Sequence, residues 1–219
     1  MADYQKINTL FKRDEKSKNI IIGDYTFDYF KTLENTLWEC TEKIDGTNIH
    51  IDIDWRSEND WSISYHGRTE KADIPKHLLA KLKSMFDNFN PNNVFDFKEP
   101  ITIQIFGEGY GMKIQKGCNY IANDVDFILF DIRVGKWWLK RASLEESANK
   151  MGIKIVPLIG YMNLLDAIEF VKVGYKSTIA ENKDYDAEGL VLKTQDGLLD
   201  RSGNRIITKL KTRDFAFLK

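Results

Sequence analysis

Five short polar clusters in this chain carry side chains whose types and order could do chemistry. One of them, the segment ITKLK, contains Lys209 and Lys211. Residues two apart on a strand point to the same face, so these two ammonium groups would lie close together and repel each other. An anion between them removes the repulsion, and a triphosphate would serve. The other clusters are KIDGTN (43–48), HGRTEK with Arg68, FGEGYG with Glu108 and DAEGLVLK with Glu188.

Each cluster taken alone has a simpler explanation. Asp45-Gly46 is a typical pair for a tight turn between two strands. GEGYG is a short glycine run without the third-glycine spacing and the strand–helix context of a dinucleotide-binding loop. A pair of lysines on one strand is usually a solvated edge. The specific signal is therefore the order of the five clusters along the chain.

The clusters stand at the ends or edges of predicted strands. Residues 48–54 and 61–67 alternate apolar and polar side chains around the polar turn WRSEND, which predicts an antiparallel hairpin. We expect further strands at 101–109, 126–134, 187–194 and 205–211. We expect helices at 75–89, at 163–174, and from Ser143, with Glu146 completing a capping box, to just before Gly152. These elements predict an α+β fold of mostly antiparallel sheets with flanking helices, in a single domain over residues 1–219.

The composition is that of an ordinary soluble globular protein. The formal net charge is −1, which excludes a globally basic nucleic-acid binder. The N-terminus has no apolar core of a signal peptide, and no apolar run approaches the roughly 18 residues that span a bilayer. Cys40 and Cys118 are too few for a disulfide framework, and no His or Cys spacing indicates zinc. We therefore expect a cytoplasmic protein, with His50 and His66 in surface or satisfied polar roles on strands.

The order of the clusters resembles that of the covalent nucleotidyltransferases. The series is K-x-D-G, an Arg-containing segment, F-G-E, F-D-I, E-G-x-V-x-K and K-x-K, and this superfamily contains ATP-dependent DNA ligases, RNA ligases and mRNA capping guanylyltransferases. EKIDGTN, FGEGYGMKIQKGCNY, FILFDI, AEGLVLK and GNRIITKLK most resemble the phage RNA ligase 2 family, from about Trp38 to Phe215. DNA ligases and capping enzymes typically have an arginine where this chain has Asn48, which favours the RNA ligase branch. The resemblance implies a nucleotidyltransferase (ATP-grasp-like ligase) adenylation domain.

By this resemblance Lys43 is the nucleophile that attacks the α-phosphate of ATP, forms a lysyl–AMP phosphoramidate and releases pyrophosphate. A free lysine has a pKa of about 10.4, so the amine must be activated. Neighbouring cations lower the pKa of a lysine, and we expect Lys209, Lys211 and a bound Mg²⁺ to act in this way. The same two lysines are expected to hold the α-phosphate, with Glu188 as a ligand of Mg²⁺ or Mn²⁺ through water.

The resemblance also implies roles for the residues around Lys43. Glu42 is expected near the purine edge, with its backbone reading N6, and Ile44 is included in the same binding site. Gly46 is expected to let the backbone approach the nucleotide. Asn48 is expected to bond the sugar or the RNA end.

Three residues further along the chain complete the nucleotide site that the resemblance implies. Arg68 is expected to contact the ribose or the phosphate of the incoming end, and Glu108 to accept a ribose hydroxyl. Phe130 matches the aromatic residue that stacks on adenine. Core packing is the alternative for Phe130, because aromatic residues on strands are usually buried.

The predicted function is an ATP-dependent RNA ligase that transfers AMP from Lys43 to an RNA 5′-phosphate and seals it to a 3′-hydroxyl, in a nicked duplex or another substrate, as in RNA repair. The alternatives are a minimal ATP-dependent DNA ligase, a cap-type guanylyltransferase, or a nucleotide-dependent module that binds RNA ends without sealing them. RNA ligase 2 proteins carry a further C-terminal helical domain, whereas this chain stops at Lys219. A protein partner that replaces this domain is therefore among the expectations.

Overall fold

The structure is a computed structural model, and it describes residues 4–69, 72–115 and 120–218. Contacts along the chain divide it into two compact units. The central unit comprises Tyr4 and Asp45–Val156, and the terminal unit comprises residues 5–44 and 157–218. The single domain expected from the sequence stays a prediction, and each unit is described separately. Cys118 lies outside the described residues.

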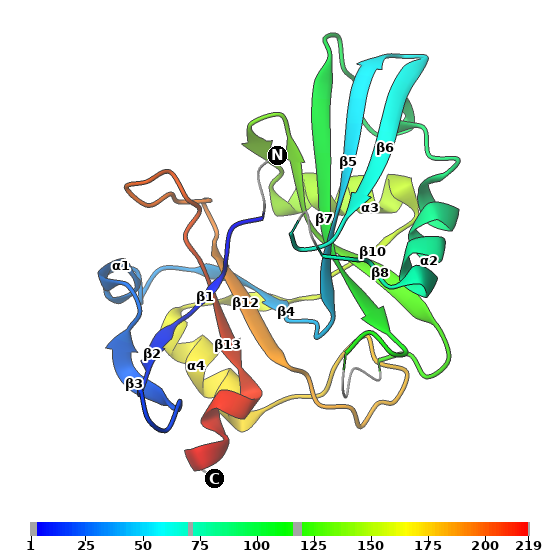
Figure 1. Cartoon of the computed structure of the whole chain (residues 1–219). Helices are drawn as coiled ribbons and strands as arrows, with labels where there is room; N and C mark the ends of the chain where they lie inside the picture. The colour runs from blue at the N-terminus through cyan, green and yellow to red at the C-terminus, as the bar shows by residue number, and fades with distance from the viewer. Residues whose placement is uncertain (1–3, 70–71, 116–119, 219) are drawn as a thin grey trace. The chain divides into compact units, whose positions relative to one another are not determined.

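The central unit is built on a six-stranded sheet in the order β10-β8-β7-β5-β6, with β9 paired to β8. All neighbouring strands are antiparallel except β10 and β8. Figure 1 shows the long strands β5, β6 and β7 side by side. The elements of this unit are β5 (Thr47–Ser57), β6 (Asp60–His66), α2 (Lys76–Phe86), the short 3-10 helix η1 (Pro91–Asn93), β7 (Ile101–Gly111), β8 (Val125–Val134), β9 (Trp137–Trp138), α3 (Arg141–Met151) and β10 (Lys154–Ile155).

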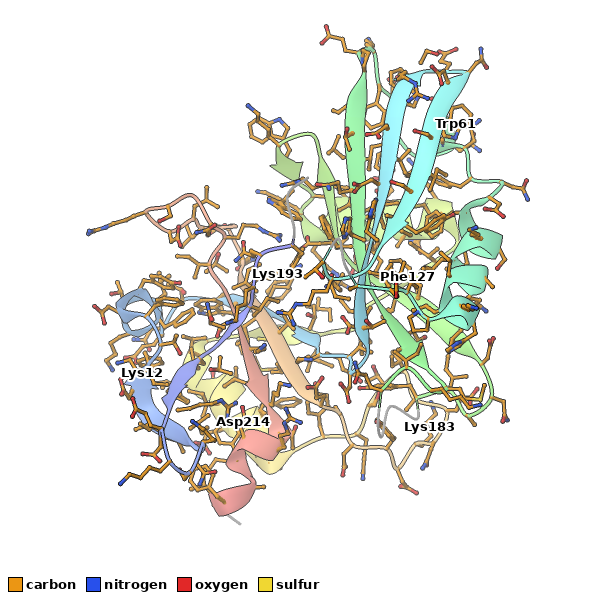
Figure 2. All side chains as sticks on the ribbon, in the orientation of Figure 1. Lys12, Trp61, Phe127, Lys183, Lys193 and Asp214 are labelled. Atoms are coloured by element: carbon orange, nitrogen blue, oxygen red, sulfur yellow. The ribbon has the colours of Figure 1, made fainter. Side chains whose placement is uncertain are left out.

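The two faces of this sheet differ in chemistry because side chains alternate along each strand. One face carries the isoleucines at positions 49, 51 and 53 of β5 and packs against the buried leucines of α2 and α3. Phe127, labelled in Figure 2, belongs to this core and packs edge-on against Phe86 of α2. The opposite face carries buried polar side chains, including His50, Asp52 and Gln104.

The terminal unit contains a five-stranded sheet in the order β1-β13-β12-β4-β11 and a separate β2–β3 pair. Only the β1–β13 pairing in these two sheets is parallel. The elements are β1 (Asn8–Thr9), β2 (Phe11–Arg13), β3 (Ile20–Tyr25), α1 (Asp28–Thr32), β4 (Trp38–Glu42), β11 (Leu158–Met162), α4 (Leu164–Val173), β12 (Gly189–Thr194), β13 (Ile207–Lys211) and the 3-10 helix η2 (Thr212–Leu218). Helix α4 packs its buried face, which includes Leu164, Ile168 and Val171, into the core of this unit with Leu190, Leu192 and Leu210 of the sheet.

The α+β class and most of the expected elements are confirmed, but the start of one helix is not. We expected α3 to begin at Ser143 with a capping box to Glu146. The helix begins at Arg141 instead, with Lys140 as its N-cap residue and no side-chain hydrogen bond at the cap. Arg141 donates to Glu145 at 2.6 Å and to the carbonyl of Val156 at 3.0 Å, and these contacts stabilise the additional first-turn residues.

The start of α4 and the end of α3 agree better with the sequence patterns. Asn163 caps α4 by accepting a hydrogen bond from the backbone N–H of Asp166. Gly152 ends α3 in the left-handed conformation, with φ of 66°. Among the described residues, no helix is both long enough and apolar enough to cross a membrane.

Candidate active site

Three neighbouring strands of the terminal unit bring three of the predicted residues together at one end of the strands. In the antiparallel register Gly189 of β12 lies opposite Lys211 of β13. Glu42 is the last residue of β4, and the N–H of Lys43 extends the ladder by donating to the carbonyl of Gly189 at 2.8 Å. Because β4 and β12 run antiparallel, Lys43 leaves one strand where Glu188 enters the other. The pairing of the backbone therefore positions all three side chains.

Glu188 binds the two lysines through its two carboxylate oxygens. The Nζ atom of Lys43 lies 2.5 Å from Oε2 of Glu188, and the Nζ atom of Lys211 lies 2.7 Å from Oε1. The three side chains are only 12–19% exposed. Lys43 Nζ also donates to the carbonyl of Ile44 at 3.4 Å. This arrangement places two cations on a single anion in a largely buried setting.

The charges of the two lysines keep Glu188 ionised. Burial alone would raise the pKa of the Glu188 carboxyl. The positive charge of Lys43 and the hydrogen bonds from Lys211 and Lys43 outweigh that effect, so the pKa lies below its ordinary value. The carboxylate is therefore negatively charged at neutral pH and forms ion pairs with both lysines.

The glycine after Glu188 is required by the packing of the two strands. Gly189 has φ of 147°, and a Cβ atom at this position would overlap the carbonyl of Leu210 on β13. The carbonyl of Gly189 also accepts a hydrogen bond from the hydroxyl of Tyr175 at 2.5 Å, in addition to that from Lys43. A side chain at Gly189 would thus displace the backbone that positions Lys43 and Lys211.

Further charged residues lie on the same face of this sheet. Lys209 is two residues before Lys211 on β13, so both lysines point to one face, as expected. Lys193 of β12 pairs with Glu39 of β4, and the alternation along the strands places both on that face. Lys193 is labelled in Figure 2. Our sequence analysis did not select Lys193 or Glu39, although Lys193 is the last residue of the E-G-x-V-x-K pattern.

Glu42 points to the opposite face of β4 and is 1% exposed. Its carboxylate accepts hydrogen bonds from the Ser177 hydroxyl at 2.5 Å, the Thr178 hydroxyl at 2.8 Å and the Thr178 N–H at 3.0 Å. Its own N–H donates to the carbonyl of Pro157 at 2.9 Å. The side chain of Glu42 therefore anchors the 177–178 segment, and Ile44 is likewise buried. Purine contacts of these two residues stay predictions.

The central unit brings Asn48 and Glu108 together. The two residues are partners in the β5–β7 register, and both side chains are half-buried. Gly46, which precedes β5, packs closely on β7, since a Cβ atom there would lie 2.8 Å from Cγ of Glu108 and overlap the carbonyl of Gly109. In the structure Gly46 leaves room for the neighbouring strand. The expected approach of its backbone to a nucleotide stays a prediction.

Phe130 lies at an irregularity of β8 where the register with β7 shifts. Its ring packs edge-on against Tyr4, with the ring centroids 5.0 Å apart. The Tyr4 hydroxyl donates to the buried carboxylate of Asp131 at 2.7 Å. Phe130 is only half-buried, so its side chain is not enclosed in the core.

Arg68 follows β6 and is exposed. Asp45 lies in the turn that leads into β5, and its N–H donates to the hydroxyl of Tyr120 at 3.1 Å. The residues predicted from the sequence thus fall into separate groups. Lys43, Glu188 and Lys211 contact one another in the terminal unit, whereas Asn48 and Glu108 are strand partners in the central unit.

Lys43, Glu188 and Lys211 all lie within the segment of the chain that matches a known protein family. The RNA ligase family matches residues 36–211. The chain belongs to the RNA ligase family.

Solved structures of an RNA ligase from Naegleria gruberi have a similar fold. A ligand-free mutant, described as RNA ligase R4a, is 19% identical and has a TM-score of 0.59, with 87% of this chain and 54% of that chain covered. The structure with PPi is 19% identical with a TM-score of 0.61, covering 98% of this chain and 63% of that one. A mutant with ATP and Mn is 16% identical with a TM-score of 0.59, covering 96% and 61%. The chain therefore spans between about half and two thirds of the length of these proteins.

Proposed function

We propose that this chain is an ATP-dependent RNA ligase that forms a covalent lysyl–AMP intermediate on Lys43. The observation that carries the proposal is the binding of Glu188 to both Lys43 and Lys211 through its two carboxylate oxygens. Membership of the RNA ligase family supports the reaction class. The similar structures include complexes with PPi and with ATP and Mn, which supports ATP as the substrate and a divalent cation as the cofactor.

The three clustered side chains have the chemistry that the first step requires. The neutral amine of Lys43 attacks the α-phosphorus of ATP, a P–N bond forms, and the bond between the α-phosphorus and the bridging oxygen breaks. Pyrophosphate leaves with that electron pair, and the attacking nitrogen releases a proton to solvent. Lys43 must therefore leave the carboxylate of Glu188, to which it is bound in the structure. The phosphates offer Lys211 an alternative anionic partner at the same moment.

The residues present also fit a divalent cation. A carboxylate is the hard oxygen ligand that Mg²⁺ and Mn²⁺ prefer, and the ionised Glu188 would offer one to the cation once Lys43 has left it. A cation bound there would neutralise phosphate charge during the transfer. Lys209 and Lys211 would contribute fixed positive charge to the same end, because both lie on one face of β13.

The later steps are proposed from the family. AMP passes from Lys43 to the 5′-phosphate of an RNA end, and the 3′-hydroxyl of a second end then displaces AMP. For Asn48, Arg68, Glu108 and Phe130 we propose the contacts with sugar, phosphate and adenine that the resemblance implies. Glu42 and Ile44 are proposed to contact the purine through the backbone, because the carboxylate of Glu42 is already bound to Ser177 and Thr178.

The test is transfer of label from α-labelled ATP to the protein in the presence of Mg²⁺. We expect one labelled adduct per chain, lost in Lys43→Ala and in Lys43→Arg, whose guanidinium keeps the charge but is not a nucleophile at neutral pH. Lys12→Ala is the matched control. Lys12 is an exposed lysine of the same unit, and its ammonium group pairs with Asp24 of the neighbouring strand β3. Absence of label on the native chain would contradict the proposal.

Two further comparisons separate the alternatives. Labelling by GTP in preference to ATP would indicate a guanylyltransferase. Addition of nicked RNA and nicked DNA duplexes after adenylylation then asks which strand is sealed. We expect sealing of RNA, whereas sealing of DNA alone would indicate a DNA ligase. Binding of RNA ends without any adduct on Lys43 would indicate a binding module.

A further inference from the structure

Two histidines and an aspartate form a cluster on the polar face of the central unit's sheet. In the β5–β6 register His50 lies directly opposite His66. Asp52 is two residues after His50 on β5 and therefore points to the same face. The three side chains come from two neighbouring strands, which explains why no spacing of histidines in the sequence indicates this site.

The ligand atoms of the three side chains lie close together, but somewhat farther apart than the ligands of a bound metal ion. One ligand atom from each of the three residues can be chosen so that all three lie within 4.8 Å of one another. The imidazole rings are stacked, with centroids 4.6 Å apart and an interplanar angle of 15°. Nε2 of His66 lies 3.8 Å from Oδ2 of Asp52. Ligands of a tetrahedral zinc-type ion, at bond lengths of about 2.0–2.1 Å, are about 3.3 Å apart, so side-chain rotations that shorten the separations of the ligand atoms by about 1.5 Å at most complete the site.

The aspartate is oriented by a second layer of hydrogen bonds. The side-chain amide of Gln104 donates to Oδ1 of Asp52 at 2.9 Å, and Arg133 donates to the Gln104 carbonyl oxygen. This leaves Oδ2 of Asp52 on the side of His66. Hydrogen bonds that hold a ligating carboxylate in place are a regular feature of metal sites.

The burial of the cluster provides both a rigid base and an access route. His50 and Asp52 are each 4% exposed, so their positions are fixed by packing. His66 lies on β6, the edge strand of the sheet, and its side chain is 22% exposed. Its Nε2 is within 2.9 Å of the Ser64 hydroxyl, a contact that a metal would replace. An ion can therefore reach the cluster from the side of His66, the least enclosed of the three side chains.

We propose that His50, Asp52 and His66 bind a divalent transition-metal ion of the zinc type. Two imidazoles and one carboxylate select Zn²⁺, Co²⁺ or Ni²⁺ over Mg²⁺, which prefers oxygen ligands. The site is independent of the proposed cation at Glu188 and does not rest on the ligase reaction. Such an ion would fasten the edge strand β6 to β5 two residues before Arg68, and so would stabilise the segment that presents this arginine.

The proposal is tested by titrating the metal-free full chain with Zn²⁺ against a chromophoric chelator, and with Co²⁺ followed by absorption spectroscopy. We expect one ion per chain and a Co²⁺ spectrum of nitrogen and oxygen ligands without a thiolate charge-transfer band. His66→Ala and Asp52→Asn should each weaken binding about tenfold or more, since even a second-layer residue changes metal affinity by about 10–100-fold. His77→Ala is the matched control, because His77 lies on α2 and contacts the carbonyl of Met112 instead.

The variant at His66 keeps the test interpretable, because this residue is partly exposed on an edge strand and its loss is compatible with folding. Circular dichroism of metal-free His66→Ala should match that of the native chain, and Zn²⁺ should raise the melting temperature of the native chain only. Lys43→Ala should bind Zn²⁺ as the native chain does. The proposal is overturned by a lack of saturable binding, by unchanged binding in His66→Ala, or by a thiolate band, which would place the ion on a cysteine.

Discussion

Lys43 and Glu188 are 145 residues apart in the chain, yet Nζ of the lysine lies 2.5 Å from Oε2 of the glutamate. The ladder from β4 to β12 produces this contact, since Lys43 leaves one strand where Glu188 enters the next. The contact holds the proposed nucleophile against a carboxylate. In the proposed mechanism Lys43 leaves Glu188 before it attacks ATP, and the charge of Glu188 then serves Lys211 and the divalent cation.

Glu188→Gln should reduce the rate of label transfer from ATP by about 100-fold or more. The amide keeps the shape of the side chain but removes the charge that binds Lys43, Lys211 and the proposed cation. Rates are measured in single turnover at saturating ATP and Mg²⁺. Glu169→Gln is the control, because Glu169 forms an exposed ion pair with Lys172 in the same unit. Equal rates in Glu188→Gln and the native chain would show that Glu188 is only a structural partner.

The same ion pairs predict how stability depends on pH. The pKa of Glu188 is lowered in the folded chain from its ordinary 4.5. A carboxyl with a depressed pKa contributes stability that is present above pH 4.5 and is lost as the pH falls through the folded pKa. The native chain should therefore lose more free energy of unfolding between pH 6 and pH 3 than Glu188→Gln does. Urea unfolding at several pH values measures the difference, and parallel curves for the two proteins would contradict this prediction.

Gly189→Ala should destabilise the terminal unit by about 2–5 kcal/mol, because the new Cβ overlaps the carbonyl of Leu210 and the backbone conformation disfavours any side chain. Gly197→Ala is the matched control. Gly197 also has a positive φ, of 67°, but a Cβ atom there meets nothing within 4 Å, so we expect a loss of only about 1–2 kcal/mol. The free energy of unfolding is measured by denaturant titration, and equal losses in the two variants would refute the role of strand packing.

The parts of the fold that were predictable have strong local patterns. The alternating residues around WRSEND gave the β5–β6 hairpin, and Asn163 and Gly174 bracket α4 as expected. The short strands β1, β2 and β3 were not predicted, because β1 and β2 are only two and three residues long and the six residues of β3, IIIGDY, do not alternate apolar and polar side chains. The predicted start of α3 was wrong, because Arg141 donates a hydrogen bond to the carbonyl of Val156 and no capping pattern in the sequence indicates this contact.

The residues of the candidate site could be predicted from the sequence, whereas most of the contacts between them could not. The motif order identified Lys43, Glu188 and Lys211, and the phosphate expected between Lys209 and Lys211 stays a prediction. What the sequence did not indicate is the contact of Glu188 with both Lys43 and Lys211. This contact depends on strand register over long separations. The His50, Asp52 and His66 cluster was missed for the same reason, since its members meet only across two strands.

Glu42→Gln should lower the free energy of unfolding by about 1–3 kcal/mol without changing the preference for ATP over GTP. The carboxylate accepts hydrogen bonds from Ser177 and Thr178 while buried, and the amide cannot accept all of them. A purine contact through the backbone is unaffected by the side chain. Denaturant titration and competition labelling measure the two quantities, and a changed nucleotide preference with native stability would assign the side chain to purine recognition.

Phe130→Ala should raise the KM for ATP by about 5- to 150-fold, because stacking of a base on an aromatic ring contributes about 1–3 kcal/mol. The substitution also removes a ring contact with Tyr4, so it needs a control that removes the same kind of contact. Trp138→Leu serves, since the Trp138 ring packs edge-on against Tyr4 at 5.7 Å. We expect similar losses of stability in both variants and a raised KM only in Phe130→Ala. A KM raised equally in both would mean that the aromatic cluster around Tyr4 acts on ATP through packing, and that Phe130 does not stack on adenine.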